Sequence, residues 1–283
     1  MNSDTSSTAD RIWPTLLNLQ IAARSASPGW DELVSGGVRM RADGSWACTD
    51  PLDDAAQRLC ELYLPLCADA AGRRYAVAHL GQSLDGRIAT ACGASQWVTG
   101  PEDVVHNHRM RALADVVLVG AGTVRHDDPQ LTVRHCAGAN PVRVVVDTNR
   151  RLNADYGVFR DGKAPTLLLC AEDLHRPGER HGTAEVIGLP RRGEGLAPAA
   201  ILDTLSARGL NFVFIEGGGI TVSRFLEAGV LDRLQVTVAP LILGSGRPSF
   251  TLPEVDTIAG GLRPISRHIV LGSDVLFDCV LHD

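Results

Sequence analysis

Several features that mark membrane, secreted and nucleic-acid-binding proteins are missing from this sequence of 283 residues. No apolar run reaches the ~20 residues that a membrane-spanning helix needs. The polar N-terminus shows no basic segment followed by an apolar one, so we expect no signal peptide. The net charge of −6 argues against an extended nucleic-acid surface. The sequence therefore predicts a protein without membrane or nucleic-acid partners.

Paired cysteines are also missing. The seven cysteines are an odd number and form no CxxC pair, which is typical of reduced thiols in a cytoplasmic protein. Metal-ligand spacing is equally absent. Cys48, Cys60 and Cys67 lie far apart, and His106 and His108 point about 200° apart on a predicted helix. We therefore expect a cytoplasmic protein that holds no metal.

The hydrophobic content of 45% is enough to fill a core, and the chain divides by pattern into three parts. Residues 1–9 are polar and are expected to be disordered. Residues 10–72 form a small α+β module, in which IWPTLLNLQIAA and DDAAQRLCELYLPLC are predicted helices and GVRMRADGSWACT is a predicted hairpin. Such a module is marginal for folding alone, so we expect it to cover the main domain, 73–283, without chemistry of its own.

From Tyr75 onward strand-like and helix-like segments alternate, which predicts an α/β fold with a mostly parallel central sheet. The last two strands flank Gly272-Ser273, so we expect an antiparallel C-terminal hairpin. In such sheets ligands gather at the C-terminal ends of the strands. The predicted strands are Tyr75–Leu80, Val116–Val119, Val142–Val146, Thr166–Leu169, Phe212–Ile215, Leu234–Val238, His268–Leu271 and Val275–Leu281, and the predicted helices are Glu102–Leu113, Pro198–Arg208 and Thr221–Glu227.

The stretch FIEGGGITVSRFLEAG joins a strand to a helix through Glu216 and three glycines, Gly217 to Gly219. Free N–H groups at a helix N-terminus attract anions, and glycine lets a phosphate approach the backbone. A tight turn that needs positive φ explains the glycines equally well, because the full G-x-G-x-x-G spacing and the lysine of a P-loop are missing. Glu216 would repel a phosphate unless its carboxylate serves another group.

Three other strand ends carry glycines, hydroxyls, acids and arginines, in SLDGRIATACGASQWVTG, GAGTVRHDDPQLTVR and DTNRR. Trp97 is either an aromatic wall for a cofactor ring or an anchor of the core. Arg134 offers the bidentate donor that a phosphate prefers. Arg150 and Arg151, after the Val142–Val146 strand, either bind a 2′-phosphate or form a solvated charge cluster.

These segments, together with RALADVV, PVRVVVDTNRRL, EAGVLDRL and APLILGSG, occur in this order from about Tyr75 to the C-terminus. They resemble the reductase domain of the RibD-type riboflavin-biosynthesis deaminase/reductase family, which has a dihydrofolate-reductase-like fold. The resemblance implies a homodimer that reduces a ribosylaminopyrimidine phosphate with NADPH, by hydride transfer to ribose C1′. The His-x-Glu and Pro-Cys-x-x-Cys zinc motifs of the deaminase half are missing, so we expect no deaminase activity.

The resemblance also assigns site residues. Arg111 and Arg134 would clamp the substrate phosphate, and the glycines would take the cofactor pyrophosphate. The implied cofactor-binding residues are Gly81, Trp97, Thr123, Asp127, Thr148, Gly217, Gly218 and Gly219. The implied substrate-binding residues are Ser95, Arg111, Leu131, Arg134 and Glu216, and the implied catalytic residues are Glu216 and Asp127.

Two positions depart from the family pattern. His79 stands where the family often has lysine, and Gln82 stands at a position that is usually small. Two alternatives therefore remain: a paralogous NADPH-dependent reductase of another heterocyclic substrate, or a nucleotide-binding protein without turnover.

Overall fold

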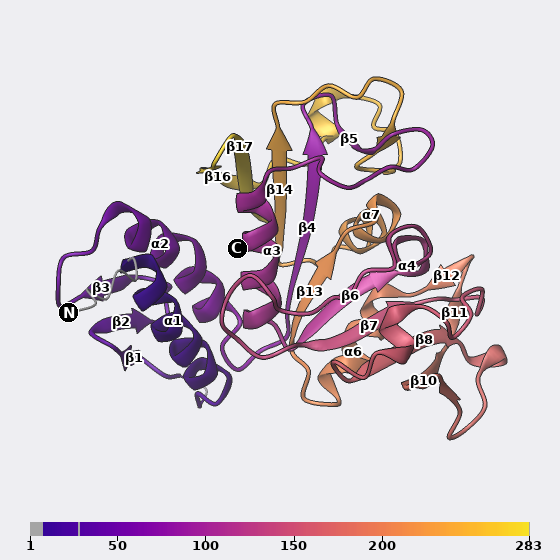
Figure 1. Ribbon diagram of the computed structural model, residues 1–283, viewed down its shortest axis with the longest axis horizontal. Helices are drawn as coiled ribbons and strands as arrows, with labels where there is room; N and C mark the ends of the chain where they lie inside the picture. Colours follow the sequence, from indigo (N-terminus) through magenta and orange to yellow (C-terminus); the bar gives the residue numbers. More distant parts are fainter. Residues whose placement is uncertain (1–7, 28, 283) are drawn as a thin grey trace, which may run out of the picture. The chain divides into compact units, whose positions relative to one another are not determined.

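The computed structural model describes residues 8–27 and 29–282, and these form two compact units (Figure 1). The smaller unit consists of residues 8–75 with 137–139, and the larger of residues 76–136 with 140–282. Residues 1–7 of the tail that was expected to be disordered lie outside the described residues. Thr8 and Ala9 are the first residues of a helix.

The smaller unit contains two helices and a three-stranded antiparallel sheet of order β1-β2-β3. Asp53 begins the second helix, because its side chain accepts the N–H of Ala56 at 2.8 Å. The rings of Trp13 and Tyr63 pack edge to face with centroids 5.4 Å apart. Both helices and the hairpin lie where the sequence predicts them, whereas β1 has no counterpart in the prediction. The elements are α1 (Thr8–Arg24), β1 (Glu32–Ser35), β2 (Val38–Arg41), β3 (Trp46–Cys48) and α2 (Asp54–Asp69).

The larger unit is built on a ten-stranded sheet of order β16-β17-β14-β4-β13-β6-β7-β8-β10-β9. The pairs β14/β4, β13/β6, β6/β7, β7/β8 and β8/β10 are parallel, while β16, β17 and β9 pair antiparallel. The predicted fold class, a mostly parallel sheet with an antiparallel C-terminal hairpin, is confirmed. The strands are β4 (Tyr75–Ser83), β6 (Val116–Gly120), β7 (Val142–Val146), β8 (Thr166–Ala171), β9 (Arg180–His181), β10 (Ala184–Leu189), β13 (Phe212–Glu216), β14 (Arg233–Ala239), β16 (Ile265–Leu271) and β17 (Asp274–Val280).

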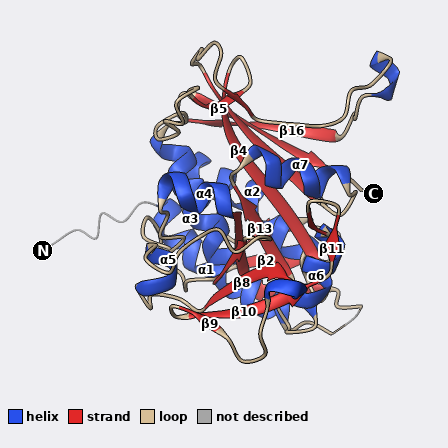
Figure 2. Ribbon diagram, turned by 90° about the vertical axis from the view of Figure 1, so that its right-hand side faces the viewer, coloured by secondary structure: helices blue, strands red, loops and turns tan. Residues whose placement is uncertain are grey.

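Helices cover both faces of this sheet. Figure 2 shows α3 and α4 on one side of the strands and α6 and α7 on the other. On the α6 and α7 side, Val144, Ile215 and Phe225 belong to one buried apolar cluster. The helices are α3 (Pro101–Leu113), α4 (Ala121–Asp127), α5 (Gly157–Arg160), α6 (Pro198–Ser206) and α7 (Gly219–Glu227), with short 3₁₀ turns at η1 (Glu172–Leu174) and η2 (Ile258–Gly260).

Two small antiparallel ribbons complete the unit, β5 (Arg87–Ala89) with β15 (Arg247–Pro248), and β11 (Arg191–Arg192) with β12 (Gly195–Leu196). Their short segments carry no periodic pattern, and the sequence did not predict them. Among the described residues, none of the helices is both long and apolar enough to span a bilayer.

The connections explain where a ligand can bind. The neighbouring parallel strands β6 and β13 lead away in opposite directions, because β6 continues through α4 to β7 and β13 continues through α7 to β14. The first turns of α4 and α7 therefore diverge to opposite faces and leave a crevice beyond the strand ends, at the switch point of the sheet.

Candidate active site

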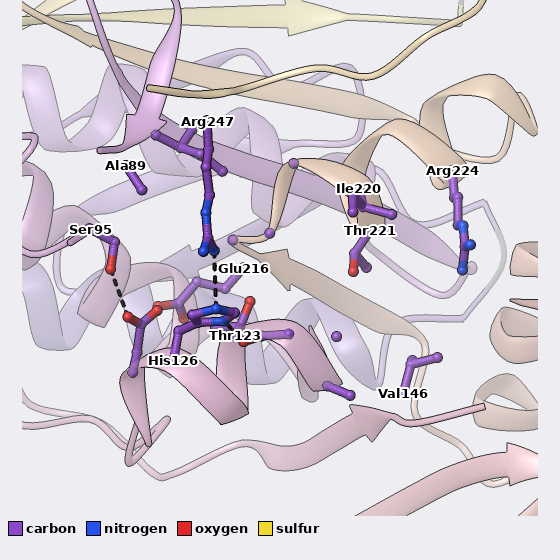
Figure 3. Close-up of a pocket in the computed structure, with 18 of the residues that line it drawn as sticks. Ala89, Ser95, Thr123, His126, Val146, Glu216, Ile220, Thr221, Arg224 and Arg247 are labelled. Carbon is purple, nitrogen blue, oxygen red and sulfur yellow. Dashed lines mark hydrogen bonds between the residues drawn. The ribbon is translucent and has the colours of Figure 1, made fainter. Parts of the chain in front are cut away.

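A cavity of about 1030 Å³ opens at this switch point. Figure 3 shows side chains from both faces of the sheet pointing into it. Its lining comes from the ends of β4, β6, β7 and β13, from α4 and α7, and from both small ribbons. Ligand pockets commonly measure about 300–1,000 Å³, so this cavity has room for a large ligand or for two ligands side by side.

The glycine loop between β13 and α7 forms one wall. Gly217 and Gly218 have φ values of 72° and 71°, a region that other residues rarely adopt. A Cβ on Gly219 would lie 3.0 Å from the carbonyl oxygen of Pro248 and nearer still to that of Ser249. A Cβ on Gly218 would lie 3.0 Å from Oγ1 of Thr123. The loop thus needs glycine for its turn, and it also presents bare backbone to the cavity.

Glu216, at the start of this loop, is paired with Arg111 of α3. Nε of Arg111 donates to Oε2 of Glu216 at 2.7 Å, and Nη2 donates to Oε1, so the two groups form a fork. Nη1 of Arg111 donates to the carbonyl oxygen of Thr132 at 2.9 Å. The carboxylate is therefore compensated by a buried guanidinium, which explains how an acid can stand beside an anion cradle.

Arg111 also affects a neighbouring histidine. The pKa of His108 is lowered to about 3 by burial and by the charges of Arg111 and Arg134. Nδ1 of His108 accepts the N–H of Arg134 at 2.8 Å, as a neutral imidazole nitrogen can. His108 therefore acts as a neutral acceptor that fixes the backbone at Arg134.

A second polar pair lies on another wall of the cavity. The hydroxyl of Ser95 donates to Oδ1 of Asp127 at 2.6 Å, and Figure 3 shows this bond. Leu131, which is buried and has a φ of 55°, lines the cavity nearby. A serine, two carboxylates and an apolar side chain can together recognise a polar sugar and the flat ring that it carries.

The structure brings most of the expected site residues to this one cavity, but not all of them. Trp97 is 79% exposed and does not line the cavity, so the idea that it anchors the core is wrong. Arg111 lies behind Glu216, and Arg134 donates to Oγ1 of Thr132 at 2.6 Å. Neither arginine is a lining residue. The expected residues that line the cavity are Gly81, Ser95, Thr123, Asp127, Leu131, Thr148, Glu216, Gly217, Gly218 and Gly219.

The two arginines after β7, Arg150 and Arg151, also differ in whether they line the cavity. Arg150 has a φ of 53° and donates to Oε1 of Glu179 at 2.9 Å, away from the cavity. Arg151 lines the cavity together with Thr148 and Asn149. Of the two arginines considered for a 2′-phosphate, only Arg151 lines the cavity.

The lining residues that sequence reasoning missed include His126, Arg224 and Arg247. Nδ1 of His126 bonds to the carbonyl oxygen of Gly122 at 2.6 Å, and Nη1 of Arg247 lies 3.2 Å from Nε2 of His126. The contact between Arg247 and His126 joins residues 121 positions apart, so no local sequence pattern could predict it. No group of three potential metal ligands occurs within residues 8–27 and 29–282.

His79 does not reach the cavity. It is 2% exposed, and its Nε2 lies 3.1 Å from Oδ1 of Asp103 and 3.1 Å from Oγ1 of Thr237. Burial by itself would raise the pKa of Asp103, but His79 and the hydrogen bonds hold it well below its usual range. The departure at His79 therefore changes a buried network behind the sheet and not the lining.

A parallel sheet with a glycine loop and a compensated carboxylate at its switch point is typical of α/β enzymes that bind a nucleotide. The sequence model of the RibD C-terminal domain family matches residues 74–275. Over 215 residues the chain is 35% identical to the 2,5-diamino-6-ribosylamino-4(3H)-pyrimidinone 5′-phosphate reductase of Methanothermobacter thermautotrophicus, covering 73% of this chain and 97% of that protein. The protein therefore belongs to the RibD C-terminal domain family, and it is a reductase of that family.

Longer relatives match over part of their length. The riboflavin biosynthesis protein RibD of Escherichia coli is 30% identical over 202 residues, which cover 66% of this chain and 54% of that protein. The crystal structure of the deaminase/reductase of Thermotoga maritima superposes with a TM-score of 0.63 at 26% identity, covering 81% of this chain and 62% of that chain. The chain thus spans about half the length of the RibD relatives and nearly all of the archaeal reductase.

Proposed function

We propose that this protein reduces the ribosyl group of a ribosylaminopyrimidine phosphate with NADPH, as a step of riboflavin biosynthesis. The archaeal relative that the chain covers almost completely carries the name of such a reductase. The observation that carries the proposal is a single cavity that combines a bare glycine loop with the polar set Ser95, Asp127 and Glu216. A nucleotide and a sugar phosphate would then meet side by side in one cavity, and hydride transfer requires that proximity.

The glycine-loop side fits a nicotinamide nucleotide. Gly217 has no atom within 4 Å of where a Cβ would stand, so its backbone faces open space. Thr123, Thr148 and Gly81 line the same cavity. When bound, the cofactor would supply the hydride that reduces C1′ of the ribose. These residues bind and orient the cofactor and exclude water from the reacting faces. Trp97 is kept as a cofactor contact only as a prediction.

The other side fits the substrate. Glu216, held in place by Arg111, accepts hydrogen bonds from the sugar or pyrimidine, and Asp127, held by Ser95, does the same from the opposite wall. Leu131 offers an apolar surface to the ring. Arg134 does not line the cavity, so its contact with the substrate phosphate stays a prediction. Asp127 and Glu216 are the carboxylates that can accept or return a proton as the ribose opens.

NADPH is proposed over NADH because Arg151 lines the cavity beside Thr148 and Asn149. A hydrogen bond to a charged group contributes about 1.5–3 kcal/mol, so one 2′-phosphate contact gives about tenfold or more in affinity. Arg151→Gln should therefore raise the Kd for NADPH and leave the Kd for NADH unchanged. Arg150→Gln is the matched control, because Arg150 is engaged with Glu179. Equal affinities for the two nucleotides in the unaltered protein would overturn the preference.

The decisive experiment measures NADPH consumption with 5-amino-6-(5-phosphoribosylamino)uracil and with its 2,5-diamino counterpart, while product formation is followed by mass spectrometry. Turnover of either compound supports the proposal. A protein that binds NADPH but reduces neither is a reductase of another substrate or a binding protein. The buried position of His79 gives no reason to favour another substrate.

We also propose a cytoplasmic homodimer, paired through β16 and β17. The strand β16 lies at the edge of the sheet and exposes Ile265 at 68% and Val270 at 67%, next to Phe277 at 40%. An exposed apolar edge strand invites pairing with a second chain. Light scattering at micromolar concentration should give twice the chain mass. A stable species of 30.2 kDa would exclude the dimer.

A further inference from the structure

The large cavity carries an arginine whose charge nothing in the proposed reaction uses. Arg247 of β15 lines the cavity, and Figure 3 shows its guanidinium pointing toward His126 of α4. Nη1 of Arg247 lies 3.2 Å from Nε2 of His126, and among the described residues no carboxylate forms an ion pair with Arg247. A cation that faces a cavity without a counter-ion is available to an anionic ligand.

His126 is oriented so that its Nε2 can accept a hydrogen bond from Arg247. Its Nδ1 lies 2.6 Å from the carbonyl oxygen of Gly122, which can accept but not donate, so Nδ1 carries the proton. Nε2 of the neutral ring is then an acceptor, and it takes an N–H of Arg247. His126 thus fixes one edge of the guanidinium and leaves its other donors free to bind a ligand.

The position of Arg247 identifies the part of the ligand that it meets. The residues that follow it, Pro248 and Ser249, place their carbonyl oxygens against Gly219 of the glycine loop. Thr123 and His126 lie three residues apart on α4, and Thr123 approaches Gly218 of the same loop. Arg247 therefore stands beside the glycine loop, close to its turn, with its guanidinium directed toward His126.

The charges around the glycine loop also favour an anionic ligand beside Arg247. The chain has a single lysine, Lys163, which bonds to Gln130 and does not line the cavity, so only arginine or histidine can supply positive charge there. Glu216 is neutralised by Arg111, whereas Asp127 has no ion-pair partner among the described residues. A ligand with two negative charges at the glycine loop needs a cation beside it, and Arg247 provides one.

We propose that Arg247, positioned by His126, binds the diphosphate of the dinucleotide cofactor beside the glycine loop. The inference rests on the proposed function, since it assumes a dinucleotide in this cavity. Nucleotides that share the diphosphate should depend on Arg247 equally, whatever stands at the 2′ position of the adenosine. His126 is a positioning residue that acts through Arg247.

The test is isothermal titration calorimetry of four chains with three ligands, without any turnover. The chains are the unaltered protein, Arg247→Gln, His126→Ala and Arg125→Gln. The last is the matched control, an exposed arginine of α4 that does not line the cavity. The ligands are NADPH, NADH and adenosine 2′,5′-bisphosphate, which lacks the diphosphate bridge and the nicotinamide half.

Arg247→Gln should raise the Kd for NADPH and for NADH by the same factor, about tenfold or more. It should leave the affinity for adenosine 2′,5′-bisphosphate unchanged. His126→Ala should give a smaller loss of the same pattern, and Arg125→Gln should give none. Circular dichroism and the unchanged bisphosphate affinity together show that Arg247→Gln is folded.

Three results would overturn the proposal. They are an unchanged dinucleotide affinity in Arg247→Gln, an equal loss for the bisphosphate, and an unaltered protein that binds neither dinucleotide. An Arg247→Gln chain with normal dinucleotide affinity but a raised KM for the sugar phosphate would assign Arg247 to the substrate instead. A protein that binds NADPH through Arg247 but reduces no ribosylaminopyrimidine would refute only the proposed reaction.

Discussion

Arg111 is the residue on which the charge of Glu216 depends. The side chain of Arg111 is 9% exposed and that of Glu216 is 18% exposed, so neither charge is well solvated without the other. Breaking a buried pair by removing one partner costs about 3–5 kcal/mol, because the remaining charge is left uncompensated. For Arg111→Ala we expect the lower end of that range, about 3 kcal/mol, in the free energy of unfolding measured with urea.

A double-mutant cycle separates this positioning role from a direct contact with the substrate phosphate. If Arg111 acts through Glu216, Glu216→Gln and the double variant with Arg111→Ala should have similar KM values for the substrate. A further large increase of KM in the double variant would show that Arg111 touches the substrate itself.

Arg134 is predicted to contact the substrate phosphate, although it does not line the cavity. Its backbone N–H is fixed by His108 and its Nη1 by Thr132, so the side chain is placed without an acidic partner among the described residues. Arg134→Ala should raise the KM of the sugar phosphate by about tenfold or more and leave the Kd for NADPH nearly unchanged. A loss of NADPH affinity would mean that the two halves of the cavity are assigned in reverse.

The sequence predicted which strand ends form the site, but it did not predict which side chains pair with one another there. GAGT and EGGG could be recognised because glycine and polar residues after an apolar strand are a local signal. The fork between Arg111 and Glu216 joins residues 105 positions apart, and the two arginines after β7 are identical in local pattern although only Arg151 faces the cavity. Which side chain points inward is decided by tertiary packing, which a single sequence does not display.

At the scale of elements, α3 shows how far a polar helix can be buried. Its Asp103 accepts from Oγ1 of Thr237 at 2.6 Å, and its His106 bonds to Oε1 of Gln235 at 2.9 Å, both on β14. Helix spacing predicted the limits of α3 well. The facing residues on β14 could not be found in advance, because a polar side chain in a strand is usually solvated.

Burial and then the charge of His79 lower the pKa of His106 to about 4, against the opposing effect of Asp103. The folded pKa lies below the value of about 6.5 in the unfolded chain, so as the pH falls the unfolded chain takes up the proton first. The stabilisation is therefore complete above about pH 6.5 and is lost as the pH falls toward 4.

Between about pH 7 and about pH 5 this linkage should remove about 2 kcal/mol from the free energy of unfolding. His106→Gln, which keeps a side-chain amide near Gln235, should reduce that pH dependence, as measured by urea unfolding at both pH values. His282→Gln is the control, because His282 is exposed. An unchanged pH dependence in His106→Gln would show that other groups cause it.

The strands at the sheet edge show a different limit of sequence reasoning. β10 was missed although Ala184–Leu189 pairs in parallel with β8, because its glutamate and its glycine interrupt the apolar pattern. The ribbon of β5 and β15 was missed because its strands are three and two residues long. Arg247 lies on that ribbon and lines the cavity. Because the ribbon was not predicted, this residue of the candidate site was not predicted either.

At the scale of the whole molecule, the cavity belongs to one unit alone. Its lining residues run from Leu80 to Thr251, and none lies in the smaller unit of residues 8–75 with 137–139. A chain truncated to begin near Gly72 should therefore bind NADPH with the affinity of the full protein. Calorimetric titration of the purified truncated chain measures this directly.

The truncated chain should nevertheless be less stable or aggregate more readily, because the N-terminal module was inferred to cover apolar surface and is too small to be expected to fold alone. Thermal unfolding and light scattering of both chains test this, and elemental analysis of the full chain should find no stoichiometric zinc. Two results would contradict a purely structural role. One is an isolated module that folds and binds a ligand. The other is a truncated chain that keeps its stability, dimerisation and NADPH affinity but has lost turnover, since that combination would place chemistry in the module.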